Sequence, residues 1–399
     1  MSAIDPSSSP PPGSFFHTHY QLEELIGSGG FGWVCKATRR ADGRQVAIKL
    51  IFKNRMARES IVRARWEASE GLDMWEDGTI VLPLEAYILR QARHRGVVEY
   101  LDLFADDDYF YLVMEHHGSP WLKPSSHHHV GSIIPIPSPP SPPLTPPTAS
   151  FYLHSLPSSS DMAAQASSPR SSEMMASSSH EFPRISRPTP IRRSSALNSL
   201  SLTSLEPKPQ STTMARSMPM MRRSSSSDLF ECIEQHSHFN EPTARFLFAQ
   251  IADAVYDLRK RGITHRDLKD ENIVVDAAGC VKLIDFGSAL HFRTSEPVSM
   301  CDRFFGTVSS ASPETLDKVP YHPFPAEVWS LGVLLHILLT GSTPYPTRHH
   351  IRRAQRNREL NSKLSAAAND LLDQCFAVNV DERITLERLC DHPWMRMRS

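Results

Sequence analysis

The sequence predicts an α+β protein whose folded part is interrupted by a long disordered segment. Residues 20–118 alternate strand-like and helix-like apolar patterns, and apolar residues at helical spacing return between 228 and 395. Between them, residues 119–227 consist largely of Pro and Ser, and such a composition cannot bury enough apolar surface to offset the entropy of ordering. We also expect a disordered tail at 1–19.

Composition limits the class of protein. A net charge of −1 argues against a nucleic-acid or membrane-surface role. The longest apolar run, residues 331–339, is too short to span a bilayer and predicts a buried core helix. The N-terminus lacks the apolar stretch of a signal peptide, and the six cysteines include no Cys-x-x-Cys pair, which favours reduced thiols. We therefore expect a monomer of the cytoplasm or nucleus.

The first motif is the glycine-rich stretch GSGGFGWV at 27–34, which lies between the predicted strands YQLEELI and CKAT. Glycines let a hairpin backbone approach phosphates that side chains would block. The spacing G-x-G-x-x-G-x-V, followed by a strand, favours a nucleotide lid over a Rossmann turn. We expect the lid to consist of Gly27, Ser28, Gly29, Gly30, Phe31 and Gly32.

The second motif, VAIK at 46–49, is a predicted strand that ends in Lys49. Next to a glycine-rich loop, this lysine is interpreted as the charge that meets the α- and β-phosphates of a nucleotide. An acid must hold it in place. We favour Glu85, because Leu84 and Ile88 give its helix a packing face, with Glu70 and Glu76 as alternatives.

The third motif combines ITHRDLKDENIVV at 263–275 with KLIDFGSA at 282–289. Asp267 can accept a hydroxyl proton, and Lys269 lies near the transferred phosphate. Asn272 and Asp285 are metal ligands in this interpretation. Phosphoryl transfer depends mostly on positioning and charge neutralisation, and these groups supply both.

In this order, the three motifs resemble those of the protein kinase family over residues 20–118 and 228–394. The resemblance implies a bilobal fold, with a small β-rich N-lobe at 20–118, a larger α-helical C-lobe at 228–395, and ATP and Mg²⁺ in the cleft between them. YFYLVMEHHG at 109–118 corresponds to the last strand and hinge of the N-lobe, and the next helix begins at Asp228. The segment 119–227 is therefore an insertion after the hinge, longer than compact domains usually contain.

The resemblance also implies roles for residues around the cleft. Adenine lies between Val34 and Ala47 on one side and Val274 on the other. Met114 is the gatekeeper, and the backbone of Glu115 and His117 lines the edge of the base. The resemblance also predicts an ion pair of Glu314 with Arg383. An activating phosphosite is expected at Thr294, Ser295 or Ser299, facing Arg266. The sequence departs from the family pattern at three positions, which are Ser310, Ser312 and Glu327. We expect the two departing serines to lie on the shelf that binds substrate.

Lys269, two residues after Asp267, is typical of serine/threonine kinases. The sequence is most similar to the PAS-domain-regulated kinases of the calmodulin-dependent-kinase-like group, although about 20 residues before the kinase part leave no room for a PAS domain. Asp228 and Glu271 stand where basophilic kinases read Arg or Lys upstream of the target, so we expect protein substrates with that pattern. Asp228 could equally be only a helix cap. RRSSA and RRSSSSD, in and at the end of the insertion, fit that pattern and would be phosphorylated by the chain itself or by another basophilic kinase.

Two other hypotheses remain open. The chain could be a pseudokinase scaffold that recruits partners through 119–227, including an SH3 or WW domain at the proline-rich stretch 135–147. The usual sign of a pseudokinase is loss of a residue such as Lys49 or Asp267, and the key residues are all present. Alternatively, part of 119–227 is absent from the mature protein because of an incorrect gene model.

Overall fold

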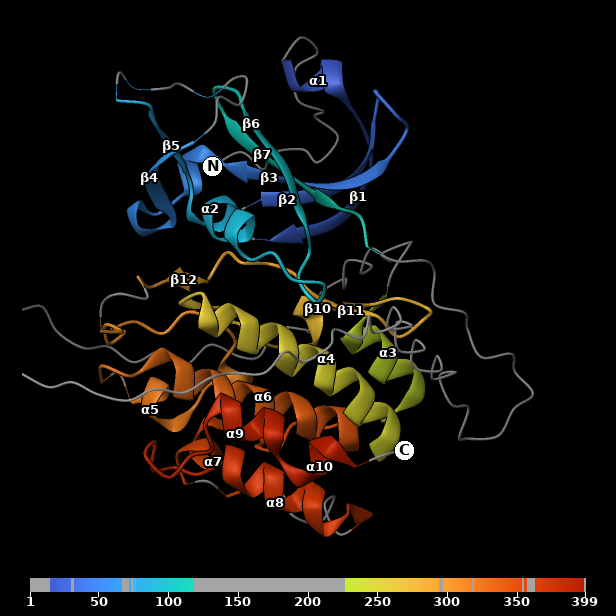
Figure 1. The fold of residues 1–399 in the computed structure, drawn as a ribbon, viewed down its shortest axis with the longest axis vertical. Helices are drawn as coiled ribbons and strands as arrows, with labels where there is room; N and C mark the ends of the chain where they lie inside the picture. Colours follow the sequence, from blue (N-terminus) through green and yellow to red (C-terminus); the bar gives the residue numbers. More distant parts are fainter. Residues whose placement is uncertain are drawn as a thin grey trace, which may run out of the picture. The chain divides into compact units, whose positions relative to one another are not determined.

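The computed structural model describes residues 15–29, 32–66, 72, 75, 77–117, 227–293, 297–317, 319–353, 355–356 and 363–397 (Figure 1). The predicted insertion, apart from Ser227, lies outside the described residues, and so do the proline-rich stretch 135–147, the serine cluster at 192–196 and residues 222–226 of the second cluster. Glu70, Glu76, Thr294 and Ser295 also fall outside them.

Five antiparallel strands form the sheet of the small lobe, in the order β1-β2-β3-β7-β6. They are β1 (Tyr20–Gly29), β2 (Gly32–Arg39), β3 (Gln45–Phe52), β6 (Tyr100–Ala105) and β7 (Tyr109–Glu115). The inner strands β3 and β7 are apolar and almost fully buried, as expected of strands that are covered on both faces. Lys49 is the one residue of β3 after Gln45 that is not buried, which leaves its side chain available to the cleft.

The predicted disordered tail is wrong for residues 15–19. These residues form the short helix α1 (Phe15–His19), which leads directly into β1. Phe16 is only 2% exposed, and its ring stacks on Tyr111 with 4.3 Å between ring centroids. Burying a phenylalanine contributes about 2 kcal/mol, enough to hold one helical turn against the sheet.

The helix of the small lobe, α2 (Leu84–Gln91), begins directly after a hairpin made of β4 (Ile61–Arg65) and β5 (Thr79–Pro83). Two short 3₁₀ turns, Lys53–Arg55 and Arg58–Ser60, connect β3 to this hairpin. The buried residues of α2 include Glu85, Ile88 and Leu89. The predicted amphipathic helix is thus present, and its packing face carries Glu85 toward the protein interior.

The large lobe is mostly helical (Figure 1). Its helices are α3 (Leu229–His236), α4 (Glu241–Lys260), α5 (Pro313–Leu316), α6 (Pro323–Thr340), α7 (Arg348–Arg352), α8 (Ala366–Cys375), α9 (Leu386–Asp391) and α10 (Pro393–Arg396). The longest, α4, begins where the side chain of Asn240 accepts a hydrogen bond from the backbone N–H of Thr243, as an N-cap residue does.

The central helix α6 is apolar on all sides, as expected of a helix surrounded by protein. Among the described helices, it alone is long and apolar enough by composition to cross a membrane, yet 78% of that stretch is buried inside the protein. Trp329 and Leu331 are fully buried. The prediction of a core helix at 331–339 is confirmed.

Short strand ladders position the loops between the lobes. The first joins β8 (Ser227–Asp228), β10 (Ile273–Val275) and β11 (Val281–Leu283), and the second joins β9 (Ile263–Thr264) to β12 (Leu290–His291). A 3₁₀ turn at Asp270–Asn272 precedes β10, and another lies at Val308–Ser310. The segment 264–273 runs from β9 to β10, and the segment 283–290 runs from β11 to β12. Because β9 pairs with β12 and β10 with β11, the two segments lie side by side.

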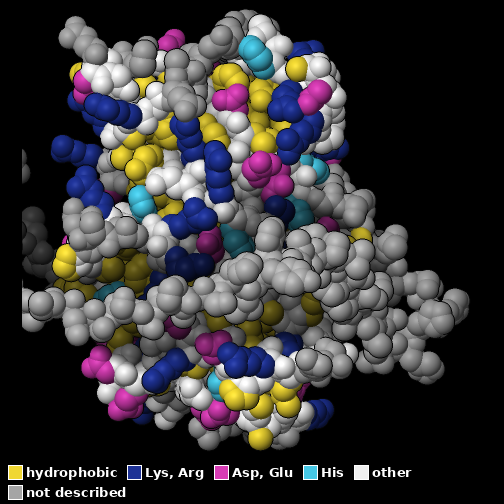
Figure 2. All heavy atoms as spheres, viewed as in Figure 1, with side chains coloured by type: hydrophobic (Ala, Val, Ile, Leu, Met, Phe, Trp, Pro, Cys, Tyr) yellow, Lys and Arg dark blue, Asp and Glu magenta, His cyan; other side chains and the backbone are white. Residues whose placement is uncertain are grey.

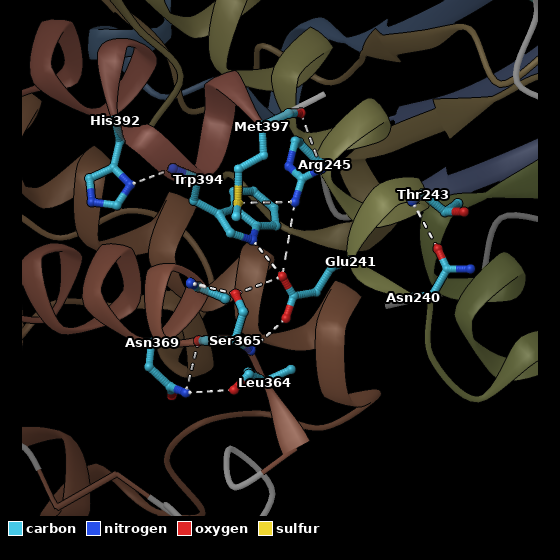
Figure 3. A network of polar contacts seen from close by, with 11 residues as sticks. Asn240, Glu241, Thr243, Arg245, Leu364, Ser365, Asn369, His392, Trp394 and Met397 are labelled. Carbon is cyan, nitrogen blue, oxygen red and sulfur yellow. Dashed lines mark hydrogen bonds and ion pairs between the residues drawn. The ribbon is translucent and has the colours of Figure 1, made fainter. Parts of the chain in front are cut away.

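A polar network around Glu241 joins three helices of the large lobe (Figure 3). The Glu241 carboxylate accepts hydrogen bonds from the backbone N–H of Ser365 (2.6 Å), from its hydroxyl (2.8 Å) and from the indole N–H of Trp394 (2.9 Å). Arg245 donates to the carbonyl of Met397 and lies over the Trp394 ring. The start of α4 thus holds α8 and the final helix, α10, in place.

Candidate active site

A cavity of about 360 Å³ lies between the two lobes. It is lined by nearly all of the predicted site residues, namely Gly27, Ser28, Gly29, Gly32, Val34, Ala47, Lys49, Glu85, Met114, Glu115, His117, Asp267, Asn272, Val274 and Asp285. Lys269 lies just beyond the cavity, with its ammonium 3.5 Å from Asp267. Gly30 and Phe31 lie outside the described residues. The fold thus brings nearly all of the site residues predicted from the sequence together around one cavity.

One end of the cavity is apolar. Val34, Ala47, Met114 and Val274 line it as predicted, and Ile26, Val98 and Ile284 add apolar surface that the sequence analysis missed. The backbone N–H of Glu115 already donates to the carbonyl of Glu99 at 3.0 Å, so it is not available to a ligand. This end therefore suits a flat, largely apolar ring bound against the chain at residues 115–117.

The glycine-rich hairpin contains glycines with different constraints. A Cβ added at Gly29 would meet nothing within 4 Å, so the open side of the hairpin faces free space. A Cβ at Gly32 would lie 2.0 Å from the carbonyl oxygen of Leu50 on β3. Gly32 is thus required by the close approach of two strands, in addition to any role toward a ligand.

The other end of the cavity is charged. The Lys49 ammonium contacts both carboxylate oxygens of Glu85, at 2.7 and 2.8 Å, and Asp285 Oδ1 at 2.9 Å. Burial alone would lower the pKa of Lys49, but the two carboxylates raise it above its ordinary value. The lysine charge in turn holds the pKa of Asp285 at about 2. The favoured pairing of Lys49 with Glu85 is therefore present, although burial and the nearby Asp285 raise the pKa of Glu85.

Asp267 is held by hydrogen bonds from three donors. Its Oδ1 accepts from the backbone N–H and the hydroxyl of Thr307, both at 2.9 Å, and its Oδ2 accepts from the Asn272 side-chain amide at 3.0 Å. Gly306 precedes Thr307 with φ +119°, and a Cβ there would lie 2.5 Å from the carbonyl oxygen of Arg266. The sequence analysis missed both residues. The stretch FGT, with a glycine next to a hydroxyl-bearing residue, is the signal that could have indicated them.

Two residues at this end have a strained backbone. Arg266 (φ 66°) and Asp285 (φ 62°) both adopt the left-handed conformation, which is uncommon for residues other than glycine and is found most often at functional sites. Glu327 Oε1 stabilises the backbone conformation of Arg266 by accepting hydrogen bonds from the backbone N–H groups of His265 (2.6 Å) and Arg266 (3.2 Å). Burial raises the pKa of Glu327 to about 7. Glu327, where the family pattern has aspartate, thus still provides the carboxyl group that fixes the loop at residues 265–266.

The acidic residues predicted to read a basic substrate differ in their surroundings. Asp228 is only 8% exposed, and its carboxylate caps α3 by accepting from the backbone N–H of Glu231 at 2.8 Å. Glu271 is exposed. Burial and the neighbouring Glu271 raise the pKa of Asp270, between them, to about 7. The cap interpretation of Asp228 is therefore correct, and an acidic cluster surrounds it.

The predicted contacts farther along the chain are present only in part. Arg383 donates to both carboxylate oxygens of Glu314, at 2.7 and 3.0 Å, as the resemblance predicts. Ser310 and Ser312 are 6% and 1% exposed, so the expectation that they lie on an open substrate shelf is wrong. They are buried because the loop around them packs against α6, where Ser330 donates to the Ser310 carbonyl.

The segment between Asp285 and Glu314, which the resemblance to protein kinases identifies as the activation segment, is described only in part. Ser299 is exposed. The guanidinium of Arg266 donates to the carbonyl of Arg303 at 3.2 Å and lies 4.6 Å from the centre of the Phe305 ring. Arg266 is thus engaged by the activation segment itself.

Potential metal ligands are few. All six cysteines are free of disulfide bonds in the structure. Within the described part of the chain, no group of three or more His, Cys, Asp or Glu side chains is arranged to hold a metal ion. Asn272 and Asp285, at the charged end of the cavity, suit only a cation that takes most of its ligands from elsewhere. Mg²⁺ bound to nucleotide phosphates is such a cation.

Comparison with known proteins agrees with this geometry. The sequence profile of the family described as "Protein kinase domain" matches residues 20–128 and 206–395. The chain is 33% identical over 179 residues to the serine/threonine-protein kinase PSK2 of Saccharomyces cerevisiae, and 36% identical over 178 residues to the PAS domain-containing serine/threonine-protein kinase of Mus musculus. It is 37% identical over 169 residues to the serine/threonine-protein kinase pim-2 of Danio rerio. These matches cover 45%, 44% and 42% of this chain, but only 16%, 12% and 53% of the respective relatives.

Proposed function

Because the chain belongs to the protein kinase domain family, we propose that it is a serine/threonine protein kinase that transfers the γ-phosphate of ATP to protein hydroxyls. The observation that carries the proposal is the charged end of the cavity. Lys49, paired with Glu85 and Asp285, faces the same space as Asp267 and Asn272. Phosphoryl transfer requires a fixed cation, metal ligands and an acceptor for the hydroxyl proton in one place, and these residues supply them.

Each residue then has one task. The apolar end of the cavity binds adenine, and the backbone of the glycine-rich hairpin covers the phosphates. Lys49 binds the α- and β-phosphates, while Asn272 and Asp285 would hold Mg²⁺, which neutralises phosphate charge when bound. Asp267 orients the substrate hydroxyl and accepts its proton, and Lys269 stabilises the charge that develops on the transferred group.

We further propose that the substrates carry Arg or Lys upstream of the target residue. The support is the acidic cluster of Asp228, Asp270 and Glu271, of which the last two directly follow the catalytic loop that contains Asp267. Because Asp228 is buried as a helix cap, Glu271 is the exposed carboxylate through which a guanidinium would be bound. Self-phosphorylation of the serine clusters at 192–196 and 222–228 follows from the same preference.

The test is phosphate transfer from ATP-Mg²⁺ to two peptides that differ only in one upstream arginine. We expect the arginine peptide to be preferred, and Asp267→Asn to lower kcat by about a hundredfold or more because it removes the proton acceptor. Transfer without a preference would refute the basophilic part alone. ATP binding without transfer to either peptide would instead favour the scaffold hypothesis, in which partners bind through 119–227.

A further inference from the structure

A second hollow lies outside the nucleotide cleft, where the β4–β5 hairpin meets the ends of α2 and α4. It has a volume of about 800 Å³. Its described lining consists of four arginines (Arg65, Arg90, Arg93 and Arg261), two aromatic residues (Trp66 and Tyr87), Gly78 and Gln91. Among the described residues, no acidic side chain lines this arginine hollow. Figure 2 shows Lys and Arg side chains gathered on this face of the small lobe, over α2.

Two of the arginines are held in position. The Arg90 guanidinium lies 4.2 Å from the centre of the Trp66 ring. Arg261 donates to Asp257 at 2.7 Å and to the carbonyls of Gln91 and Arg93 at 3.5 and 3.3 Å. Fixing a guanidinium in advance lowers the entropy lost when it binds a ligand.

The other two arginines present their charge to solvent. Arg65 and Arg93 are exposed, and their side chains make no hydrogen bond or ion pair with any residue that the structure describes. Placing the guanidinium groups of Arg65 and Arg93 around one hollow costs electrostatic free energy, which a bound anion would recover. The arrangement therefore indicates an anionic ligand.

The shape and chemistry of the hollow narrow the class of ligand. All four cations are arginines, whose planar guanidinium groups match the oxygens of a phosphate in pairs. The hollow is wide and shallow, so it can admit a phosphorylated side chain together with the residues beside it, and its aromatic walls can pack against those residues. The net charge of −1 disfavours a nucleic acid.

We propose that the arginine hollow binds a phosphorylated serine or threonine of a protein substrate, at a distance from the residue that the cleft phosphorylates. This inference rests on the proposed kinase function and adds a substrate class to it, namely proteins that already carry one phosphate. Docking raises the local concentration of the substrate at the cleft, so it lowers KM without changing kcat.

The test measures binding of a fluorescein-labelled peptide with one phosphoserine among Gly and Ala, and of its unphosphorylated form, to the full chain without ATP. We expect only the phosphorylated peptide to bind. The double variant Arg65→Ala/Arg93→Ala should weaken binding by about a hundredfold, since each phosphate contact that is lost costs about tenfold. The matched control is Arg95→Ala/Arg396→Ala, which removes the same charge at positions 82% and 67% exposed. It should bind as the wild type does.

Three results would overturn the proposal. They are equal binding of the two peptides, an equal loss in both double variants, and tighter binding of phosphoinositide vesicles than of the phosphopeptide. Melting temperatures within about 2 °C of the wild type would show that the variants are folded. Because the binding assay needs no catalysis, an inactive chain would refute the proposed function without deciding this inference. In an active chain, KM should rise in the hollow variant for a primed peptide and stay unchanged for an unprimed one.

Discussion

The hydroxyl of Thr307 provides a direct test of how the catalytic aspartate is positioned. Asp267 Oδ1 accepts from both the backbone N–H and the hydroxyl of Thr307, each at 2.9 Å. Thr307→Val keeps the branched shape and the backbone N–H and removes only the hydroxyl. The carboxylate of Asp267 then keeps its bonds to the Thr307 N–H and to Asn272, but loses one of the two that fix Oδ1.

The size of the effect follows from the type of bond. A hydrogen bond to a charged group contributes about 1.5–3 kcal/mol, and the lower end applies because Thr307 is only half-buried and water can replace its hydroxyl. About 1.4 kcal/mol corresponds to a tenfold change in rate. We therefore expect Thr307→Val to lower kcat about tenfold. KM for ATP should not change, because Thr307 does not line the nucleotide cavity.

The assay is steady-state phosphate transfer to a serine peptide at saturating ATP, with Thr307→Ser as the matched control. Serine retains the hydroxyl, so it should stay within about threefold of the wild-type kcat. An unchanged kcat in Thr307→Val would refute the positioning role of the hydroxyl. Equal losses in the valine and serine variants would assign the effect to packing of the loop.

Three further predictions concern charge. Glu241→Gln should lower the free energy of unfolding by about 2–4 kcal/mol at pH 7, since it weakens three hydrogen bonds. Burial raises the pKa of Glu241, but its hydrogen bonds outweigh burial and lower the pKa below its ordinary value. The stability that the carboxylate contributes is therefore fully present above pH 4.5 and is lost as the pH falls further. In urea unfolding, the difference in stability between wild type and variant should be smaller at pH 3.5 than at pH 7. Glu314→Gln should cost about 3 kcal/mol in the same assay, because it leaves the fully buried Arg383 side chain without its counter-charge. The pKa of Asp270, raised to about 7, means that this carboxyl gains its charge as pH rises from 6 to 8; the ratio of kcat/KM for arginine and alanine peptides should increase over that range, and a constant ratio would exclude Asp270 from substrate reading.

The sequence predicts best what rests on periodicity or on a compact motif. Glu85 could be chosen over its neighbours because Leu84 and Ile88 define a helical face, and the structure pairs Glu85 with Lys49. The core helix α6 was equally predictable, because a long uninterrupted apolar run in a folded protein is nearly always buried in the core. Both inferences use residues that lie within a few positions of one another.

The sequence predicts poorly where two roles require the same residue or where a contact joins distant loops. Aspartate is favoured both as a helix cap and as a reader of arginine, so only the geometry at Asp228 identified the cap. Thr307 reaches Asp267 across 40 positions, without any periodic pattern. The helix α1 is held by the stacking of Phe16 on Tyr111 of β7, a contact between distant positions that no local pattern around Phe16 indicates.

The position of the insertion explains why such a long segment is compatible with the fold. On one side of it, β7 ends at Glu115, which pairs with Val46; on the other, Ser227 and Asp228 pair with Val275 and Val274. Both ends are thus fixed by strand ladders and not by the connection between them. Lengthening a connection from about ten to about 110 residues adds only about 2 kcal/mol of closure entropy. The described residues that line the nucleotide cleft all belong to the parts of the chain on either side of 119–227, which these ladders hold in place.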